Sequence, residues 1–327
     1  MNPERRLLLG VDGGASKTVA LIADEGGTVR GAGRAGSSDI HGPTGPAAAV
    51  ARVADAVRQA LSSAGMPAAD MTGTVFCLCG ADWPEDDDLY ATALATQLGL
   101  QSPPRVMNDS FATLRAGTPD GLGVALVLGT GGAVAARGPG GQTWFSGFRI
   151  EASGAAELGR LAYERLIRGA YGSGTAPTYQ EAALAVFGVG SVEELVHAVS
   201  RVDSPRQEWR ARLAPVLLEA GHRGEPEARA LVHEHGRMLA GYVRAAARRV
   251  RLDDGSSAVV LGGGLLRHPC PDLADAVAEG LPGWHVVRAV VEPAYGALLL
   301  AADEVGAHPR LERLRESGPE AAFFRTL

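Results

Sequence analysis

The feature that most constrains the fold is a buried strand that ends in a carboxylate and two glycines. Residues 7–11, Leu-Leu-Leu-Gly-Val, form an apolar run with the length of a short strand. Asp12 follows, and then Gly13 and Gly14, which permit positive φ and leave no side chain between backbone and ligand. Such a turn can offer N–H groups to phosphate oxygens, beside a carboxylate that can hold Mg²⁺. A plain hairpin turn between two strands explains this single stretch equally well.

Two further apolar runs also end in glycine turns. Residues 124–128 precede Gly129, Thr130, Gly131 and Gly132, and residues 258–261 precede Gly262, Gly263 and Gly264. Between the first and second turns, a short apolar stretch ends in Asn108 and Asp109. Three buried strands that end in glycine turns, two of them near a carboxylate, indicate a nucleotide held between two lobes. The first turn is not a Walker A loop, because that pattern requires glycine where Ser16 stands.

Together these motifs resemble those of the acetate kinase, sugar kinase, Hsp70 and actin superfamily. Within it the chain is most similar to N-acetylglucosamine kinases, bacterial glucosamine kinases and BadF/BadG/BcrA/BcrD-type ATPases. The family turns D-G-G-G-T-[KS] and G-T-G-S correspond to residues 12–18 and 129–132, and the adenosine turn to residues 262–264. Smaller matches are residues 36–40, 79–82, 118–121 and 293–297, and the resemblance covers about residues 7–302. It implies an α/β, two-lobed, actin-like and ribonuclease H-like duplicated fold, with an ATP cleft between the lobes.

The length of the chain also favours two lobes, because 327 residues exceed what one hydrophobic core usually holds. We expect an N-terminal lobe of residues 1–112 plus about 303–327, with the first glycine turn, the acceptor loop and the catalytic carboxylate. Residues 113–302 are then the C-terminal lobe, with the second and third turns. The repeated order of strand, glycine turn and meander at residues 7 and 124 indicates a divergent internal duplication.

Composition excludes several classes of function. The net charge of −6 and the absence of a basic stripe argue against a nucleic-acid partner. No apolar run reaches the ~18 residues of a transmembrane helix, so no membrane partner is expected. The three cysteines make no disulfide framework. We expect a cytoplasmic protein, and the family resemblance implies a homodimer.

The resemblance implies ATP and Mg²⁺ as cofactors. The expected nucleotide contacts are the residues of the three turns: Gly13, Gly14, Ala15, Ser16, Lys17, Thr18, Gly129, Thr130, Gly131, Gly132, Gly262, Gly263 and Gly264. Asp12 is the expected metal residue, acting through water. Lys17 can approach a phosphate, but a surface lysine explains it equally well.

Asp109 is the candidate general base. The family places its base in an N-D or D-D pair, and here Asn108 and Asp109 follow a short strand. Ligands of open α/β sheets bind at such carboxyl ends of strands. The alternative is that Asp109 caps the predicted helix over residues 111–116. The glycine turns on both sides favour the base.

The expected acceptor contacts are Ser38, Asp39, Asp82, Asn108, Ala133 and Glu151. Asp39 stands where the family has Asn, and an ionised Asp accepts hydrogen bonds but cannot donate them. It can pair with an ammonium group, or it can merely cap a turn. Ala133 replaces the family's Asn after G-T-G-S. In the family's G-D-E-G-S-[GA] stretch, Glu151 replaces the Asp and Ala152 replaces the second carboxylate.

Altered acceptor positions beside intact nucleotide turns predict a kinase with a changed acceptor. The expected enzyme is a phosphotransferase that uses ATP and Mg²⁺ to phosphorylate a hydroxyl of a sugar-like small molecule. The acceptor is an amino sugar, such as glucosamine or an N-acetylglucosamine-like compound, or an aminocyclitol. The alternatives are a nucleotide-dependent regulatory protein and a non-kinase ATPase of the kind that activates acyl-CoA dehydratases. The absence of Cys from residues 80–269 weakens the latter, because those activators hold an iron–sulfur cluster with Cys ligands.

Overall fold

The computed structural model describes residues 6–172, 174–201, 206–252 and 257–325. Contacts within the chain divide it into two compact units, which we describe separately. Unit 1 consists of Met1–Leu122 and Ala289–Leu327, and unit 2 of Gly123–Arg288. The sequence had placed residues 113–122 and 289–302 in the second lobe. The structure assigns them to unit 1, because the helix Pro293–Glu304 packs on the first strand and on the helix Ser110–Gly117.

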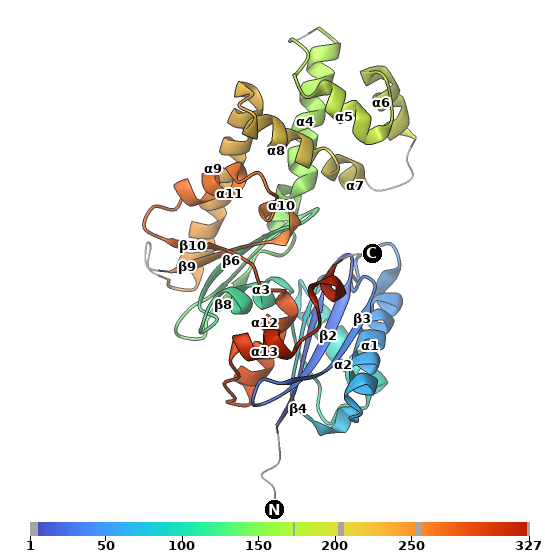
Figure 1. The fold of residues 1–327 in the computed structure, drawn as a ribbon, viewed down its shortest axis with the longest axis vertical. Helices are drawn as coiled ribbons and strands as arrows, with labels where there is room; N and C mark the ends of the chain where they lie inside the picture. Colours follow the sequence, from blue (N-terminus) through green and yellow to red (C-terminus); the bar gives the residue numbers. More distant parts are fainter. Residues whose placement is uncertain (1–5, 173, 202–205, 253–256, 326–327) are drawn as a thin grey trace, which may run out of the picture. The chain divides into compact units, whose positions relative to one another are not determined.

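Unit 1 is built on a five-stranded sheet in the order β3-β2-β1-β4-β5 (Figure 1). The strands are β1 (Leu7–Gly13), β2 (Thr18–Asp24), β3 (Val29–Ala35), β4 (Met71–Leu78) and β5 (Arg105–Met107). The first three form an antiparallel meander, whereas β4 and β5 run parallel to β1. Three neighbouring strands therefore have their carboxyl ends at one edge of the sheet, where ligands bind in α/β folds.

Helices cover both faces of this sheet. The helices α1 (Gly45–Ala64) and α2 (Pro84–Leu98) pack together, with α1 on β2 and β3. The helices α3 (Ser110–Gly117) and α12 (Pro293–Glu304) pack together, with α12 on β1 and β4. Gly10 makes this approach possible, because a Cβ there would lie 2.3 Å from the backbone nitrogen of Leu298. The short helices η1 (Ala68–Asp70), α13 (Leu311–Ser317) and η3 (Ala321–Phe324) complete the unit.

Unit 2 repeats the topology of unit 1. Its sheet has the order β8-β7-β6-β9-β10, formed by β6 (Gly123–Leu128), β7 (Gly132–Arg137), β8 (Thr143–Phe145), β9 (Ala258–Gly262) and β10 (His285–Arg288). Again the first three strands are an antiparallel meander, and the fourth and fifth run parallel to the first. The same order and directions in both units confirm the predicted internal duplication and α/β fold class.

The helices of unit 2 surround a largely aliphatic core. They are η2 (Gly147–Ser153), α4 (Ala155–Ala170), α5 (Gln180–Phe187), α6 (Val192–Ser200), α7 (Arg206–Ala211), α8 (Ala214–His222), α9 (Pro226–Arg249), α10 (Gly263–Leu266) and α11 (Asp272–Glu279). The long helix α9 packs on β6 and β7, and α8 and α11 pack on α9. The core joins apolar residues of the sheet to those of these helices.

Within the described residues, one stretch has the length and hydropathy of a membrane span, residues 180–200. The structure divides it into α5 and α6, because Gly188 ends α5 in the left-handed conformation and Ser191 caps α6. Helices of eight and nine residues extend about 12–14 Å, which is less than half of a bilayer core. This stretch is therefore weak evidence for a membrane span.

Candidate active site

Three carboxylates of unit 1 lie at or after the carboxyl ends of its parallel strands. Asp12 lies in β1, Asp82 follows β4 and Asp109 follows β5. In the sheet register Asp12 lies beside Cys77, and Cys77 beside Met107, two residues before Asp109. At the usual strand spacing, β1 and β5 are roughly 10 Å apart at this edge. Negative charge on both Asp12 and Asp109 contributes to the raised pKa of the buried Cys77 thiol, behind burial itself. The sheet therefore gathers the predicted metal residue and the predicted base at one edge.

Asn108, and not Asp109, stabilises the start of α3. Asp109 occupies the N-cap position of α3 but makes no side-chain capping hydrogen bond. The buried Asn108 Oδ1 instead accepts hydrogen bonds from Ser110 N at 3.0 Å and Ser110 Oγ at 2.6 Å. Asn108 Nδ2 donates to Asp82 Oδ1 at 3.1 Å. Asn108 thus fixes the start of α3 and one acidic neighbour, and Asp109 is not needed as a cap.

The surroundings of Asp109 favour its protonated form. Burial and then the negative charge of Asp82 raise its pKa to about 7. Burial also raises the pKa of Asp82 to about 6, which His41 opposes and the charges of Asp86 and Asp39 reinforce. A carboxyl group with a pKa near 7 is suited to accept a proton at neutral pH.

The acceptor loop, residues 36–44, is fastened to the residues that follow β4. The Tyr90 hydroxyl donates to the backbone oxygen of Ser38 and lies 3.1 Å from that of Cys79. Asp86 Oδ2 lies 3.3 Å from His41 Nε2 and accepts a hydrogen bond from Trp83 N at 3.0 Å. Asp86 and Tyr90 are four residues apart on α2, so one face of this helix holds the loop.

Asp39 does cap a turn, as one of the two readings of the sequence expected. Its Oδ1 accepts a hydrogen bond from His41 N at 2.9 Å. Its charge nevertheless contributes to the raised pKa values of both Asp82 and Asp109. Asp39 is therefore part of the same acidic cluster, and the two readings do not exclude each other.

The sequence reasoning missed the pair formed by His41 and Asp86. In the sequence Asp86 is one of three consecutive aspartates, a pattern that indicates no more than favourable negative charge at the start of a helix. The signal was the position of Asp86, three residues into the turn that starts α2, where a side chain can reach back to the preceding backbone N–H groups. The contact with His41 joins residues 45 positions apart and left no local pattern.

The first glycine turn of unit 1 is the tip of a β-hairpin. Gly14 N donates to Lys17 O at 2.8 Å and thereby closes the turn between β1 and β2. Neither Gly13 nor Gly14 has positive φ, so positive φ, one of the two reasons given from the sequence for glycine at these positions, was wrong. Gly13 is required by close packing, because a Cβ there would lie 2.4 Å from Ser38 Oγ. The exposed Ala15 and Ser16 form the tip, whereas Thr18 is buried and its hydroxyl donates to Gly36 O at 2.7 Å.

The second glycine turn repeats this packing in unit 2. A Cβ on Gly132 would lie 2.4 Å from Ser153 Oγ, the counterpart of Ser38. Gly129 and Thr130 are exposed, and Gly129 N donates to Gly131 O at 2.9 Å. The first residues of α4 donate to the backbone oxygens of Gly129 and Thr130. The two turns therefore have the same local construction, each with a serine against a glycine.

The third turn begins where β9 ends at Gly262. Gly263 has a φ of +84°, and a Cβ there would lie 2.3 Å from the backbone oxygen of Leu128. A Cβ on Gly264 would have no neighbouring atom within 4 Å.

Two predicted acceptor residues belong to unit 2. Ala133 pairs with Val127 in the β6–β7 ladder. Glu151 lies in η2, and its side chain is outside the described part of the structure.

The donor set of the predicted metal residue fits Mg²⁺ that is held mainly by a nucleotide. Among the described residues no group of three or more His, Cys, Asp or Glu side chains is arranged to hold a metal ion. Mg²⁺ usually keeps several waters and binds through one or two carboxylates plus substrate phosphates. Asp12, half-buried beside the first glycine turn, supplies one such carboxylate.

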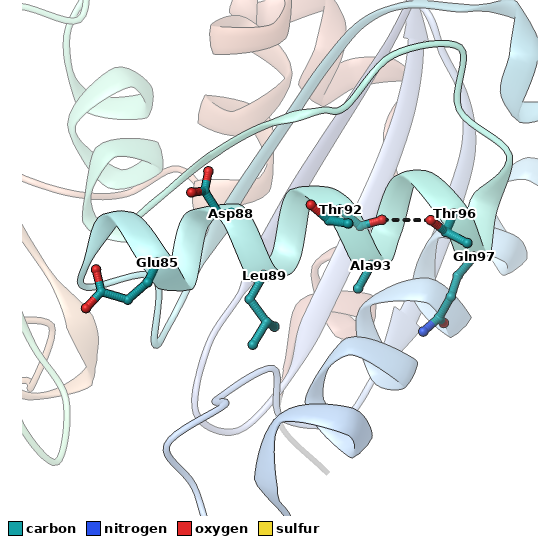
Figure 2. A pocket seen from close by; sticks show the side chains of 7 residues that line it. All are labelled: Glu85, Asp88, Leu89, Thr92, Ala93, Thr96 and Gln97. Carbon is teal, nitrogen blue, oxygen red and sulfur yellow. Dashed lines mark hydrogen bonds between the residues drawn. The ribbon is translucent and has the colours of Figure 1, made fainter.

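A hollow on the outer face of α2 is not part of this site (Figure 2). It is lined by Glu85, Asp88, Leu89, Thr92, Ala93, Thr96 and Gln97, all from one helix. Asp86 and Tyr90, which hold the acceptor loop, are buried residues of the same helix. No predicted site residue lines this hollow.

Solved structures of sugar kinases share this fold. The structure described as "Putative N-acetylglucosamine Kinase from Chromobacterium violaceum" is 27% identical, with a TM-score of 0.69 over 91% of this chain and 100% of that one. A protein of the same description from Porphyromonas gingivalis is 22% identical, with a TM-score of 0.64 over 91% and 99%. A ROK family glucokinase from Streptomyces griseus, in complex with glucose and AMPPNP, is 19% identical, with a TM-score of 0.53 over 91% and 98%.

A search of curated proteins gave no significant match. The family model of the BadF/BadG/BcrA/BcrD ATPases matches residues 9–301, nearly the whole length of the chain. The match includes the three glycine turns and the acidic cluster of unit 1. The chain is therefore a member of the BadF/BadG/BcrA/BcrD ATPase family.

Proposed function

We propose that this protein is a kinase that uses ATP and Mg²⁺ to phosphorylate a hydroxyl group of an amino sugar or an aminocyclitol. The observation that carries the proposal is the position and ionisation of Asp109. Its carboxyl group lies at the carboxyl edge of the sheet and has a pKa raised by burial to about 7. Family membership supports the use of ATP, and the sugar kinases among the similar structures support a sugar-like acceptor.

In this proposal the proton of the acceptor hydroxyl passes to the Asp109 carboxylate. The hydroxyl oxygen forms a bond to the γ-phosphorus of ATP, and the bond between that phosphorus and the leaving oxygen of ADP breaks. In unit 1 the glycine turn at residues 13–18 contacts the nucleotide, and in unit 2 the turns at residues 129–132 and 262–264 are the candidates for nucleotide contacts. Asp12 would hold Mg²⁺, which would supply positive charge that offsets the phosphates.

The acidic cluster supports an acceptor that carries an ammonium group. Asp39, Asp82, Asp86 and Asp109 are electrostatically coupled, and His41 is the basic group that opposes them in the pKa of Asp82. A cationic acceptor reduces the mutual repulsion of these carboxylates, whereas a neutral sugar does not. A regulatory protein without turnover would have no use for a base at Asp109, so we place that function second. A non-kinase ATPase would use the same base on water, and the acceptor panel below separates it from a kinase.

The test is ADP release with ATP and Mg²⁺ against a panel of glucosamine, N-acetylglucosamine, other amino sugars, neutral hexoses and aminocyclitols. We expect stimulation by acceptors with a free amine. Asp39→Asn should weaken an amine-bearing acceptor more than its hydroxyl analogue, and equal losses would contradict the role of charge. A flat panel with proven ATP binding would instead favour a regulatory protein.

Asp109→Asn tests the base directly. We expect turnover to fall by ~10²–10⁴ while ATP binding is retained. The raised pKa of Asp109 means that ionisation of this group costs stability as the pH rises through about 7. The variant should therefore melt at a higher temperature than the wild type at pH 8, and this gain should disappear near pH 4. Unchanged turnover would remove Asp109 from the mechanism.

A further inference from the structure

The side chain of Lys17 does not extend from the tip of the first glycine turn into solvent. Its Nζ donates to the backbone oxygen of Phe324 and lies 3.5 Å from Glu292 Oε2. The side chains of Lys17 and Glu292 are only 20% and 28% exposed. The ammonium group is therefore held by a carbonyl and a carboxylate of the last part of unit 1, more than 270 residues further along the chain.

The C-terminal segment, residues 311–325, is fixed at both ends of β2. At one end Ser317 Oγ accepts a hydrogen bond from Val29 N at 2.9 Å, and Arg313 donates to Thr28 Oγ1 at 3.1 Å. At the other end Phe324 is buried against Tyr295, with ring centroids 5.5 Å apart. The backbone oxygen of Phe324 accepts the hydrogen bond from Lys17 Nζ. The segment thus connects the β2–β3 turn to the predicted phosphate turn.

These contacts leave Lys17 poorly suited to bind a phosphate. The carboxylate of Glu292 offsets its charge, and a phosphate beside Lys17 would also be repelled by Glu292. The backbone oxygen of Lys17 meanwhile accepts the hydrogen bond from Gly14 that closes the turn. The position of Lys17 and the shape of the turn are therefore linked through the backbone.

We propose that Lys17 is a positioning residue, which fixes the shape of the phosphate turn by anchoring it to the C-terminal segment and does not itself bind phosphate. The inference rests on the proposed nucleotide role of this turn. Its consequence is that the last residues of the chain, far from the turn in sequence, contribute to ATP affinity. The acceptor loop contacts the turn through Gly36 and Ser38, but Asp86 and Tyr90 fasten it to α2 as well, so acceptor binding should depend less on this anchor than ATP binding does.

A double-mutant cycle tests the anchor in the full-length protein. The four proteins are the wild type, Lys17→Met, a chain that ends at Gly318, and the combination. We expect each single change to weaken MgATP binding by about tenfold, measured by calorimetry, because each removes the same contact. The combined protein should be no weaker than the weaker single variant. Lys17→Arg, which retains a cationic donor, should restore most of the affinity, and the KM for the acceptor should change less than the affinity for MgATP in every protein that folds.

If Lys17→Met weakens MgATP binding as much in the shortened chain as in the full chain, Lys17 acts on phosphate directly and the proposal is wrong. Unchanged ATP affinity in a folded shortened chain would also overturn it. Where the shortened chain fails to fold, Phe324→Ala takes its place, with the exposed Arg325→Ala as the matched control that should leave ATP affinity unchanged. A wild-type protein that does not bind ATP at all would contradict the proposed function, which is a separate outcome.

Discussion

At the scale of single residues, the carboxyl groups in the acidic cluster of unit 1 oppose one another's ionisation. Asp82 raises the pKa of Asp109, and Asp39 contributes to the raised pKa of each. Asn108 lies between Asp82 and the start of α3, so it couples the position of one carboxylate to the helix behind the other. The proton affinity of the proposed base is thus set by its neighbours as well as by burial.

This coupling predicts a specific pH dependence. If the ionised Asp109 is the base, kcat/KM should rise with pH through about 7. Asp82→Asn removes a negative charge but keeps an oxygen for Asn108, so the pKa of Asp109 should fall and the acid limb should move to lower pH, by up to about one unit. Asp88→Asn, at an exposed position on α2, is the matched control and should leave the limb in place. A limb that does not move would show that Asp82 is not coupled to the base.

At the scale of elements, the glycine turns depend on packing more than on unusual backbone geometry. Gly13 in unit 1 and Gly132 in unit 2 each lie against a serine hydroxyl, and neither has positive φ. Gly263 alone among the predicted nucleotide glycines combines positive φ with close packing. The turns are therefore shaped by what packs behind them.

Alanine at two adjacent positions tests this packing. Gly13→Ala places a methyl group 2.4 Å from Ser38 Oγ and 2.7 Å from Leu78 Cδ2, so the turn or the acceptor loop must move. We expect a loss of about 1–3 kcal/mol in stability and weaker ATP binding. Gly14→Ala is the control, because its methyl group would approach no atom closer than 3.7 Å. Equal melting temperatures for the two variants would argue against close packing as the role of Gly13.

The sequence predicted much of this fold and of the site, for identifiable reasons. Short apolar runs that end in glycine turns located β1, β6 and β9, and the repeat of that pattern indicated the duplication. The position of Asp109 after a short strand was predictable from the pattern around Asn108, whereas its role as a base stays a prediction. The contacts of Lys17 with Phe324 and of His41 with Asp86 were not, because long-range contacts between polar groups leave no periodic pattern. The unit boundaries were misplaced because α3 and α12 join unit 1 through packing alone.

At the scale of the whole molecule, unit 2 is continuous in sequence and unit 1 is not. Unit 2 begins with β6 and ends with β10, so its whole sheet lies within residues 123–288. Unit 1 needs both ends of the chain, because α12 covers β1 and β4 and Arg115 forms an ion pair with Asp303 at 2.9 Å. A single continuous fragment can therefore contain all of unit 2 but not all of unit 1.

We expect residues 123–288, expressed alone, to fold with cooperative thermal unfolding and native-like near-ultraviolet circular dichroism. Residues 1–122 alone should remain loosely packed, because the apolar face that α12 covers is then exposed. Addition of residues 289–327 as a separate peptide should restore cooperative unfolding. The opposite result, a well-folded fragment 1–122 that gains nothing from the peptide, would contradict this division of the chain.

The split composition of unit 1 has a consequence during synthesis. The chain leaves the ribosome from its N-terminus, so β1 emerges early. The helix α12, which packs on β1, is synthesised only after all of unit 2. At about 5–20 residues per second, the delay between the synthesis of β1 and that of α12 lasts roughly 15–60 s. During that time the apolar strands of the nascent chain are a target for chaperones, and unit 2 can already be complete. The order of translation thus makes unit 1, which holds the acidic cluster, the last part of the molecule to mature.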